Sequence, residues 1–271
     1  MNYSTQILWQ DLITIRETTP LIHNITNYVV MNNTANALLA LGASPVMAHA
    51  LNEVEEMVNI AAALVINIGT LNDDWIAAMQ KAMLSAKKFN KPIAFDPVGA
   101  GATTYRTETT KKLLNIATPT VIRGNASEIA AIANQNITTK GVDSTQDSQT
   151  VVTVAQTLAN LYQCTVVISG AVDFVVSQKQ IFQIENGHPL MSKVTGMGCT
   201  ATAIIGAFLA VNSDATIAAA HAMAVMGIAG EIAAEKSAGS GSLQINFLDT
   251  LYNLKAEDIA NRLKLTIKKN C

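Results

Sequence analysis

Short apolar runs, rich in β-branched residues, alternate with longer amphipathic stretches through most of the chain. This alternation predicts strands separated by helices of about ten to eighteen residues, as in an α/β fold with a mainly parallel sheet. A helix over residues 2–17 and an extended segment over 20–25 come first, followed by a helical stretch over 29–41. The strand-like runs lie at 44–48, 63–69, 92–97, 120–124 and 165–170.

The last part of the chain has a different pattern. Residues 173–177 and 180–184 are apolar runs on either side of Gln178 and Lys179, which predicts an antiparallel hairpin at the edge of the sheet. Beyond Met191 we expect helices and no further strand. Polar or glycine-rich breaks separate these helices at 212–214, at 237–242 and before residue 256.

Length and composition favour a large buried core. The 271 residues are 49% hydrophobic and only 14% charged, and no spacer or internal repeat divides them. We therefore expect one domain over residues 1–271. The net charge of -2 and the isoelectric point near 6.1 give no electrostatic footprint for a nucleic acid or an anionic membrane. The expected partner is a small molecule.

The three cysteines, Cys164, Cys199 and Cys271, are an odd number, and none has the spacing of a metal site. This pattern is typical of a reduced, cytoplasmic protein without structural zinc. Charged residues interrupt the apolar residues near the N-terminus, so no signal peptide is expected. The apolar run at 200–211 is too short to cross a membrane.

Polar residues at the carboxyl ends of the predicted strands are the first candidates for a site, because ligands of open parallel sheets bind there. Asp96 ends one apolar strand and is followed by Pro97 and by a Gly99-x-Gly101 turn. Such a carboxylate suits a site that organises Mg²⁺ or phosphate, although an Asp that caps a loop has the same appearance.

Arg123 and Glu128 lie together at the next junction between a strand and a helix. Arginine is the preferred bidentate ligand of phosphate, and a nearby acid can hold the water shell of a metal. The spacing Asn125-x-x-Glu128 is also that of a capping box, which would stabilise the helix without any role in chemistry. Both interpretations stay open at this point.

The glycine-rich segment that ends in Gly196, Met197, Gly198 and Cys199 runs directly into an apolar helix. Its backbone N–H groups and the positive end of the helix dipole predict an anion site, and the same field would favour the thiolate of Cys199. A small buried cysteine is the alternative. The letters also fit a dinucleotide fingerprint, but no strand is expected to follow, so that possibility is set aside.

The segment from His23 to Tyr28 combines uncharged hydrogen-bonding groups with apolar ones at a helix entrance. It is either a helix cap or a pocket for a small heteroaromatic ligand, with Val29 and Met47 as apolar walls. His221, in an Ala-rich helix, is interpreted as a packed histidine.

Six segments, in the same order along the chain, resemble the hydroxyethylthiazole kinase family of the ribokinase-like superfamily. They are 23–27, 42–47, 67–71, 96–102, 122–128 and 194–199. The resemblance implies a three-layer fold without a separate lid domain. It also implies transfer of the ATP γ-phosphoryl group, with Mg²⁺, to the primary hydroxyl of 4-methyl-5-(2-hydroxyethyl)thiazole in thiamine salvage. The family resemblance further implies a homotrimer with active sites at the subunit interfaces.

The resemblance assigns a role to each candidate residue. Residues that would line the thiazole pocket are Asn27, Val29, Met47, Gly69 and Gly196. Residues that would hold the nucleotide are Arg123 and Ser169, and those that would organise Mg²⁺ are Asp96 and Glu128. The amides of Gly196, Gly198 and Cys199 would stabilise the transferred group, and Cys199 stands where most of the superfamily has an aspartate base. Ser169 replaces an expected threonine, and Met197 is larger than the residue often found there.

Three alternatives to this assignment are considered. A hydroxymethylpyrimidine kinase of the same superfamily would have Asp in place of Cys199, and a nucleotide-dependent dehydratase on a related fold would also have Asp after Gly198. A sensor without catalytic activity is disfavoured, because Asp96, Arg123 and Cys199 are all present.

Overall fold

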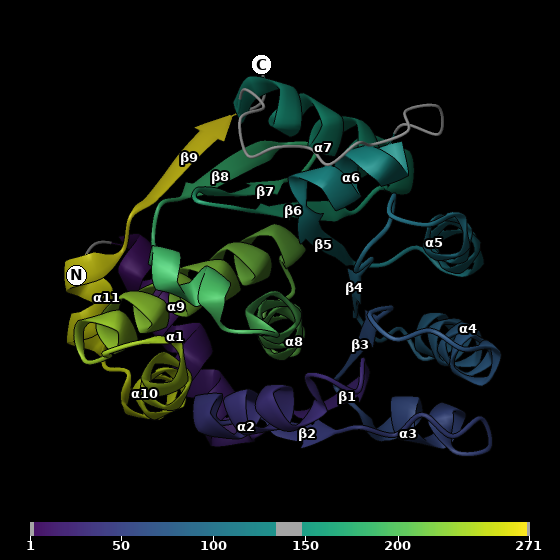
Figure 1. The fold of residues 1–271 in the computed structure, drawn as a ribbon, viewed down its shortest axis with the longest axis horizontal. Helices are drawn as coiled ribbons and strands as arrows, with labels where there is room; N and C mark the ends of the chain where they lie inside the picture. The colour runs from purple at the N-terminus through teal and green to yellow at the C-terminus, as the bar shows by residue number, and fades with distance from the viewer. Residues whose placement is uncertain (1–2, 134–147, 270–271) are drawn as a thin grey trace.

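The strands of the protein form one continuous sheet. The computed structural model describes residues 3–133 and 148–269 and contains nine strands within them. They are β1 (Leu21–Ile25), β2 (Ser44–Val46), β3 (Ala63–Asn67), β4 (Ile93–Asp96), β5 (Val121–Asn125), β6 (Thr165–Ser169), β7 (Asp173–Val176), β8 (Gln180–Ile184) and β9 (Leu265–Lys269). Their order is β2-β1-β3-β4-β5-β6-β7-β8-β9, parallel as far as β6 and antiparallel from β6 to β9 (Figure 1). The prediction of a mainly parallel sheet is confirmed.

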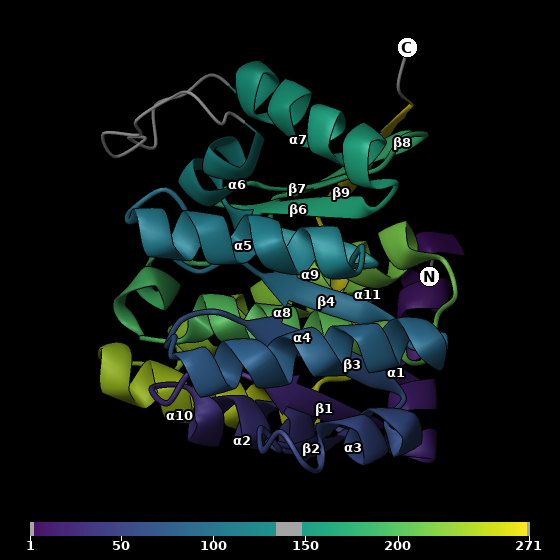
Figure 2. The same cartoon turned by 90° about the vertical axis from the view of Figure 1, so that its right-hand side faces the viewer.

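Helices cover both faces of the sheet. They are α1 (Tyr3–Thr18), α2 (Met31–Leu41), α3 (Val54–Ile60), α4 (Asp73–Lys88), α5 (Thr104–Ile116), α6 (Ala126–Ala133), α7 (Ser148–Tyr162), the 3₁₀ helix η1 (Pro189–Lys193), α8 (Met197–Leu209), α9 (Ala215–Glu235), α10 (Ser240–Asn253) and α11 (Ala256–Arg262). One layer contains α3 to α7, and the other contains α1, α2 and α8 to α11 (Figures 1 and 2). Each layer packs on its own cluster of buried apolar residues. The predicted three-layer arrangement is therefore confirmed.

Strand β3 shows why the central strands appear in the sequence as unbroken apolar runs. All five of its residues are buried. Leu64 and Ile66 belong to the core on the α4 side, whereas Ala63 and Val65 belong to the core on the α8 side. Helices cover both faces of the sheet, so side chains that alternate along the strand enter two different cores. In a sheet with one covered face, every second side chain would instead face solvent. A polar side chain is left only at the end of the strand, at Asn67.

Strand β9 corrects two predictions about the end of the chain. The hairpin of β7 and β8 forms as expected, but it is not at the edge of the sheet, because β9 pairs with β8 from Leu265 to Lys269. The expectation of no strand after Met191 is wrong for the same reason. This strand carries no buried apolar run, since Ile267 is half exposed and lysines occupy its end. Its backbone pairing with β8 holds it in place.

Two other local elements differ from the sequence predictions. Helix α3 has seven residues, which is shorter than the expected minimum of about ten, because the connection from β2 to β3 also contains the irregular segment 47–53. The 3₁₀ helix η1 was not predicted. His188 caps it by accepting the Leu190 N–H at Nδ1, over 3.2 Å. The predicted helix break at 212–214 is confirmed, with Asp214 as the cap of α9.

Helix α9 is the most apolar long helix of the described part of the chain. Among the described residues it alone has the length and mean hydropathy, 1.6, of a membrane span, but 78% of that segment is buried within the fold. His221 on α9 is buried and lies 2.6 Å from Asp11 on α1, so the interpretation of a packed histidine is confirmed. Cys271 lies outside the described residues.

Candidate active site

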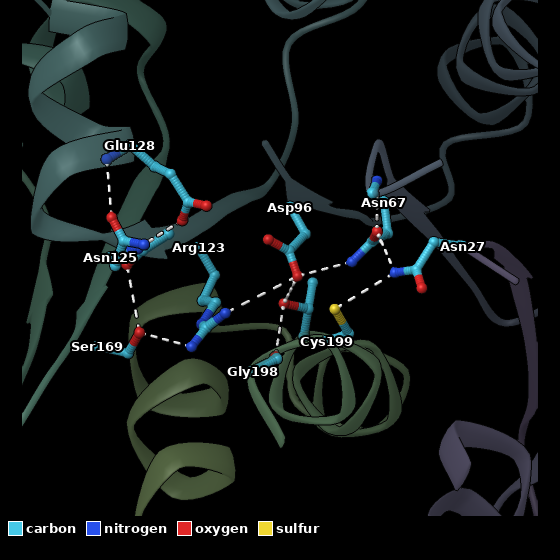
Figure 3. Close-up of polar contacts among 12 residues, drawn as sticks. Asn27, Asn67, Asp96, Arg123, Asn125, Glu128, Ser169, Gly198 and Cys199 are labelled. Carbon is cyan, nitrogen blue, oxygen red and sulfur yellow. Dashed lines mark hydrogen bonds and ion pairs between the residues drawn. The ribbon is translucent and has the colours of Figure 1, made fainter. Parts of the chain in front are cut away.

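A chain of hydrogen bonds connects the carboxyl ends of neighbouring strands (Figure 3). Asn27, which follows β1, donates to Asn67 Oδ1 on β3 over 2.9 Å, and Asn67 donates to Asp96 Oδ2 on β4 over 2.9 Å. Thr202 of α8 donates to the same Asp96 oxygen over 2.8 Å. Arg123 Nη1, from β5, lies 3.8 Å from it. Asn27, Asp96 and Arg123, which the sequence places at or near the carboxyl ends of three strands, thus lie in one network.

Asp96 is the centre of this network. Its side chain is fully buried, and burial raises its pKa to about 6, although the Arg123 guanidinium opposes that rise. Its Oδ1 atom has no hydrogen-bond partner among the described residues. A buried carboxylate oxygen without a partner is costly unless a ligand, water or cation satisfies it. The free oxygen is therefore where a bound group is expected.

Arg123 and Ser169 line a cavity of about 490 Å³. Arg123 Nη2 donates to Ser169 Oγ from the neighbouring strand β6. The guanidinium packs directly over Gly198, where a Cβ atom would lie only 2.7 Å from Nη1. The cavity therefore joins a cation to the N-terminal turn of α8, an arrangement that suits phosphate groups.

Glu128 forms the capping box that its spacing predicts. Asn125 Oδ1 accepts the Glu128 N–H over 2.9 Å, and Glu128 Oε2 accepts the Asn125 N–H over 2.8 Å. The other carboxylate oxygen, Oε1, accepts the N–H of Gly99 over 2.8 Å. Each carboxylate oxygen of Glu128 thus accepts a hydrogen bond from a backbone N–H, and these bonds fix the loop after β4 to the start of α6.

The first turn of α8 lies between the cavity at Arg123 and the side chain of Asn27. Gly196 has a positive φ of 83°, and a Cβ atom there would lie 2.6 Å from Val30 Cγ1, so only glycine fits. Cys199 Sγ accepts a hydrogen bond from Asn27 Nδ2 over 3.4 Å. Burial raises the pKa of the Cys199 thiol, and the Asp96 carboxylate adds to the rise. Desolvation and the Asp96 charge thus favour the neutral thiol, against the effect expected of the helix field.

The residues expected to line the thiazole pocket lie in unequal surroundings. Asn27 is buried, and Gly69 packs against its side chain so closely that a Cβ atom would lie 2.6 Å from Nδ2. Met47 is only partly buried. Val29 and the neighbouring Tyr28 are 65% and 60% exposed. The structure brings Asn27, Gly69 and Cys199 together but leaves Val29 on the surface of the isolated chain.

Two residues of the site escaped the sequence analysis. Thr202 lies on the second turn of the apolar helix α8. The only indication in the sequence was a hydroxyl side chain at a position within a largely apolar run. Arg106 of α5 donates to three carbonyls, those of Ile68 and Val98 over 2.8 Å and that of Gly69 over 2.9 Å. It ties the loop after β3 to the loop after β4, which no local motif indicates.

Comparison with solved structures first defines the class of the protein. A pyridoxal kinase from Staphylococcus aureus, in complex with AMP-PCP and pyridoxal, superposes with a TM-score of 0.64 at 14% identity. The match covers 92% of this chain and 98% of that chain. At this identity the likeness shows the fold alone. The fold is that of the ribokinase-like small-molecule kinases.

The chain belongs to the hydroxyethylthiazole kinase family. The family model described as "HK: Hydroxyethylthiazole kinase family" matches residues 12–257. Hydroxyethylthiazole kinase of Syntrophus aciditrophicus (strain SB) is 60% identical over 266 residues, which are 98% of each chain. The structure of the hydroxyethylthiazole kinase protein from Pyrococcus horikoshii OT3 superposes with a TM-score of 0.90 at 41% identity, over 97% of this chain and 99% of that chain. The family indicated by the six sequence segments is confirmed.

Proposed function

We propose that this protein transfers the γ-phosphoryl group of ATP to the primary hydroxyl of 4-methyl-5-(2-hydroxyethyl)thiazole, giving the thiazole phosphate for thiamine salvage. The observation that carries the proposal is the position of Cys199, between Asn27 on one side and the Asp96 and Arg123 pair on the other. An alcohol beside Asn27 and a phosphate beside Arg123 would meet at this turn. Family membership supplies the identity of the alcohol and of the phosphoryl donor.

The residues act mainly by placing the reactants and stabilising charge. The transition state of phosphoryl transfer is loose, so it asks little of a base and much of the groups around the phosphate. Arg123, Ser169 and the amides of Gly196, Gly198 and Cys199 face the phosphate side. Cys199 accepts the proton of the alcohol only when it is a thiolate, and the thiolate then becomes the thiol. Because burial raises the pKa of Cys199, only a minor fraction of the protein holds the thiolate, so the base contributes less than positioning and charge stabilisation.

Mg²⁺ fits the charged end of this site. Among the described residues no cluster of three or more His, Cys, Asp or Glu forms a closed metal shell. Mg²⁺ in kinases is commonly held by one or two carboxylates together with waters and phosphates, so a closed shell is not needed. We assign Asp96 Oδ1, the unpartnered oxygen, to the metal or its water shell, and Glu128 to a supporting role. When bound, the metal neutralises and orients the phosphates.

We also propose that the protein acts as a homotrimer in the cytoplasm, with residues 1–271 as one domain in each subunit. The exposed apolar side chains of Tyr28 and Val29 support this assembly, because a thiazole pocket that uses Val29 needs a second surface to close it. Leu51 and Ile60, which precede and end α3, are also exposed apolar side chains.

The activity is tested by coupled measurement of ADP release from ATP and Mg²⁺. Hydroxyethylthiazole, hydroxymethylpyrimidine and a reaction without acceptor are compared. We expect ADP release to depend on hydroxyethylthiazole. ADP formation that does not depend on it, or that is faster with hydroxymethylpyrimidine, would contradict the proposal.

A further inference from the structure

The cavity that contains Arg123 and Ser169 is otherwise lined mostly by apolar side chains and glycines. Four methionines line the cavity from three elements: Met191 of η1, Met197 of α8, and Met223 and Met226 of α9. Together these four residues are called the methionine wall. Met223 and Met226 are each only 4% exposed. Met197, a larger side chain than the family resemblance leads one to expect, thus lines this cavity.

The segment opposite α9 in this cavity is held in one position. Gly227 packs against the backbone of Asn186, where a Cβ atom would lie 2.6 Å from the carbonyl carbon. Gly230 packs in the same way against the side chain of Met191, which leaves no room for a Cβ atom. Glu231 Oε1 accepts the Gly187 N–H over 3.1 Å. Two glycines of α9 therefore allow the close approach of Asn186 and Met191 to this helix.

Two polar side chains of this cavity are already engaged with the protein itself. Asn186 donates to Glu231 Oε1 and to the Arg262 carbonyl, and its Oδ1 accepts the Lys264 N–H over 2.8 Å. Ser192 donates to the Pro189 carbonyl over 2.8 Å. These two side chains hold the cavity wall, so they are poor readers of a ligand.

Asp173 and His188 are the remaining polar side chains of the cavity outside Arg123 and Ser169. Asp173 Oδ1 accepts the Gly170 N–H over 2.9 Å, and His188 Nδ1 accepts the Leu190 N–H over 3.2 Å. Each side chain thus keeps one polar atom outside these bonds. An apolar wall with so few free polar groups distinguishes ligands far less than a site built to hydrogen-bond them.

We propose that the nucleotide cavity does not select adenine, and that guanosine triphosphate serves as a phosphoryl donor with efficiency comparable to that of ATP. The inference rests on the proposed kinase function. Arg123, Ser169 and α8 hold the triphosphate, which all nucleotides share. The base lies against the methionine wall, where unbranched, polarizable side chains adapt to rings that differ in their polar edges.

Direct binding tests the proposal without any need for turnover. The dissociation constants of the non-hydrolysable imido analogues of ATP and GTP are measured by calorimetry with Mg²⁺ present. We expect the two values to agree within about tenfold, because a pocket without hydrogen bonds to the base edge discriminates only weakly between bases. A larger preference for the adenosine analogue would show hydrogen-bond reading of the base and would overturn the proposal.

Variants of the methionine wall locate the base. Met226→Gln adds an amide at nearly unchanged volume and is expected to change the ratio of the two dissociation constants by at least about threefold, since it introduces a group that can read a base edge. Met191→Gln, at a less buried position, provides the same test if the first variant folds poorly. Met83→Leu, in the core on the other face of the sheet, is the control and should leave the ratio unchanged.

An unchanged ratio in a folded Met226→Gln and a folded Met191→Gln would show that the base does not lie on the methionine wall, which also overturns the proposal. Kinetics with hydroxyethylthiazole separates this failure from a failure of the proposed function. If neither triphosphate phosphorylates the thiazole, the kinase proposal fails, while the two dissociation constants still decide the question of base selection.

Discussion

The two sides of the site differ in how much of each is built by one chain. On the phosphoryl side, Asp96 is fully buried and joined to Asn67, Thr202 and Arg123. On the alcohol side, the side chain of Val29 is 65% exposed. The residues of the phosphoryl side are held by the core of a single subunit, because they lie near the ends of buried strands and on the buried helix α8. The acceptor pocket depends on what covers the exposed side.

The largest effect is expected on the phosphoryl side, from Asp96→Asn. The amide keeps the shape of the carboxylate but removes its charge, so kcat/KM should fall by about 10³-fold. The coupled ADP assay measures this change, and Asp249→Asn, on the exposed face of α10, is the matched control. A loss below about threefold would show that the Asp96 charge is not needed.

Cys199→Ala should slow turnover by about 10- to 100-fold and leave residual activity, because positioning and charge stabilisation contribute more than the base. The measurement is kcat at saturating ATP and thiazole. Cys164→Ala is the control, since Cys164 is a buried thiol of the other core whose pKa is raised by burial to about 12. Full activity of purified Cys199→Ala would exclude the base role.

Most of the fold follows from the sequence, because buried parallel strands are continuous apolar runs. Strand β9 does not, since its register comes from pairing with β8 and not from any apolar pattern of its own. Tertiary contacts decide such a strand.

The sequence predicts those residues of the site that lie at or near the ends of strands. Asp96 and Ser169 each end a strand and Arg123 lies two residues before the end of β5, so the topology of the sheet brings them together. Thr202 and Arg106 are on helices, and their partners depend on how α8 and α5 pack. The direction of the Cys199 pKa also depends on burial, which a motif does not reveal.

On the alcohol side, Val29→Asp should raise the KM for hydroxyethylthiazole by about tenfold and leave the KM for ATP unchanged. A charge placed in a covered apolar contact would also break the proposed trimer, because it cannot be desolvated cheaply. Solution mass measurement and kinetics check both effects. Leu161→Asp, on the equally exposed surface of α7, is the control. A fully active wild-type monomer would contradict the account of this side.

The smallest effect is a shift in pH dependence. The ionised form of Asp96 is needed, and its pKa is about 6, so kcat/KM should fall as the pH drops through this value. Thr202→Val removes a hydrogen bond that stabilises the ionised carboxylate and should move this limb to higher pH. Thr200→Val on the same helix is the control. If Thr202→Val does not change the pH at which kcat/KM falls, the fall reports the titration of a group other than Asp96.

The same carboxyl group affects stability in the opposite direction. Its pKa rises from 3.8 to about 6 on folding, so the folded protein binds more protons than the unfolded chain between these values. The free energy of unfolding should therefore decrease, on this account, as the pH rises through that window. Asp96→Asn should remove this contribution in denaturant titrations at several pH values.

The central claim is that the turn between Asn27 and Arg123 transfers phosphate to the thiazole alcohol. Phosphorus NMR of the reaction of wild-type protein with ATP, Mg²⁺ and hydroxyethylthiazole tests it most directly. We expect a phosphate ester on the hydroxyethyl oxygen that accumulates one for one with ADP. Inorganic phosphate in place of the ester would contradict the account.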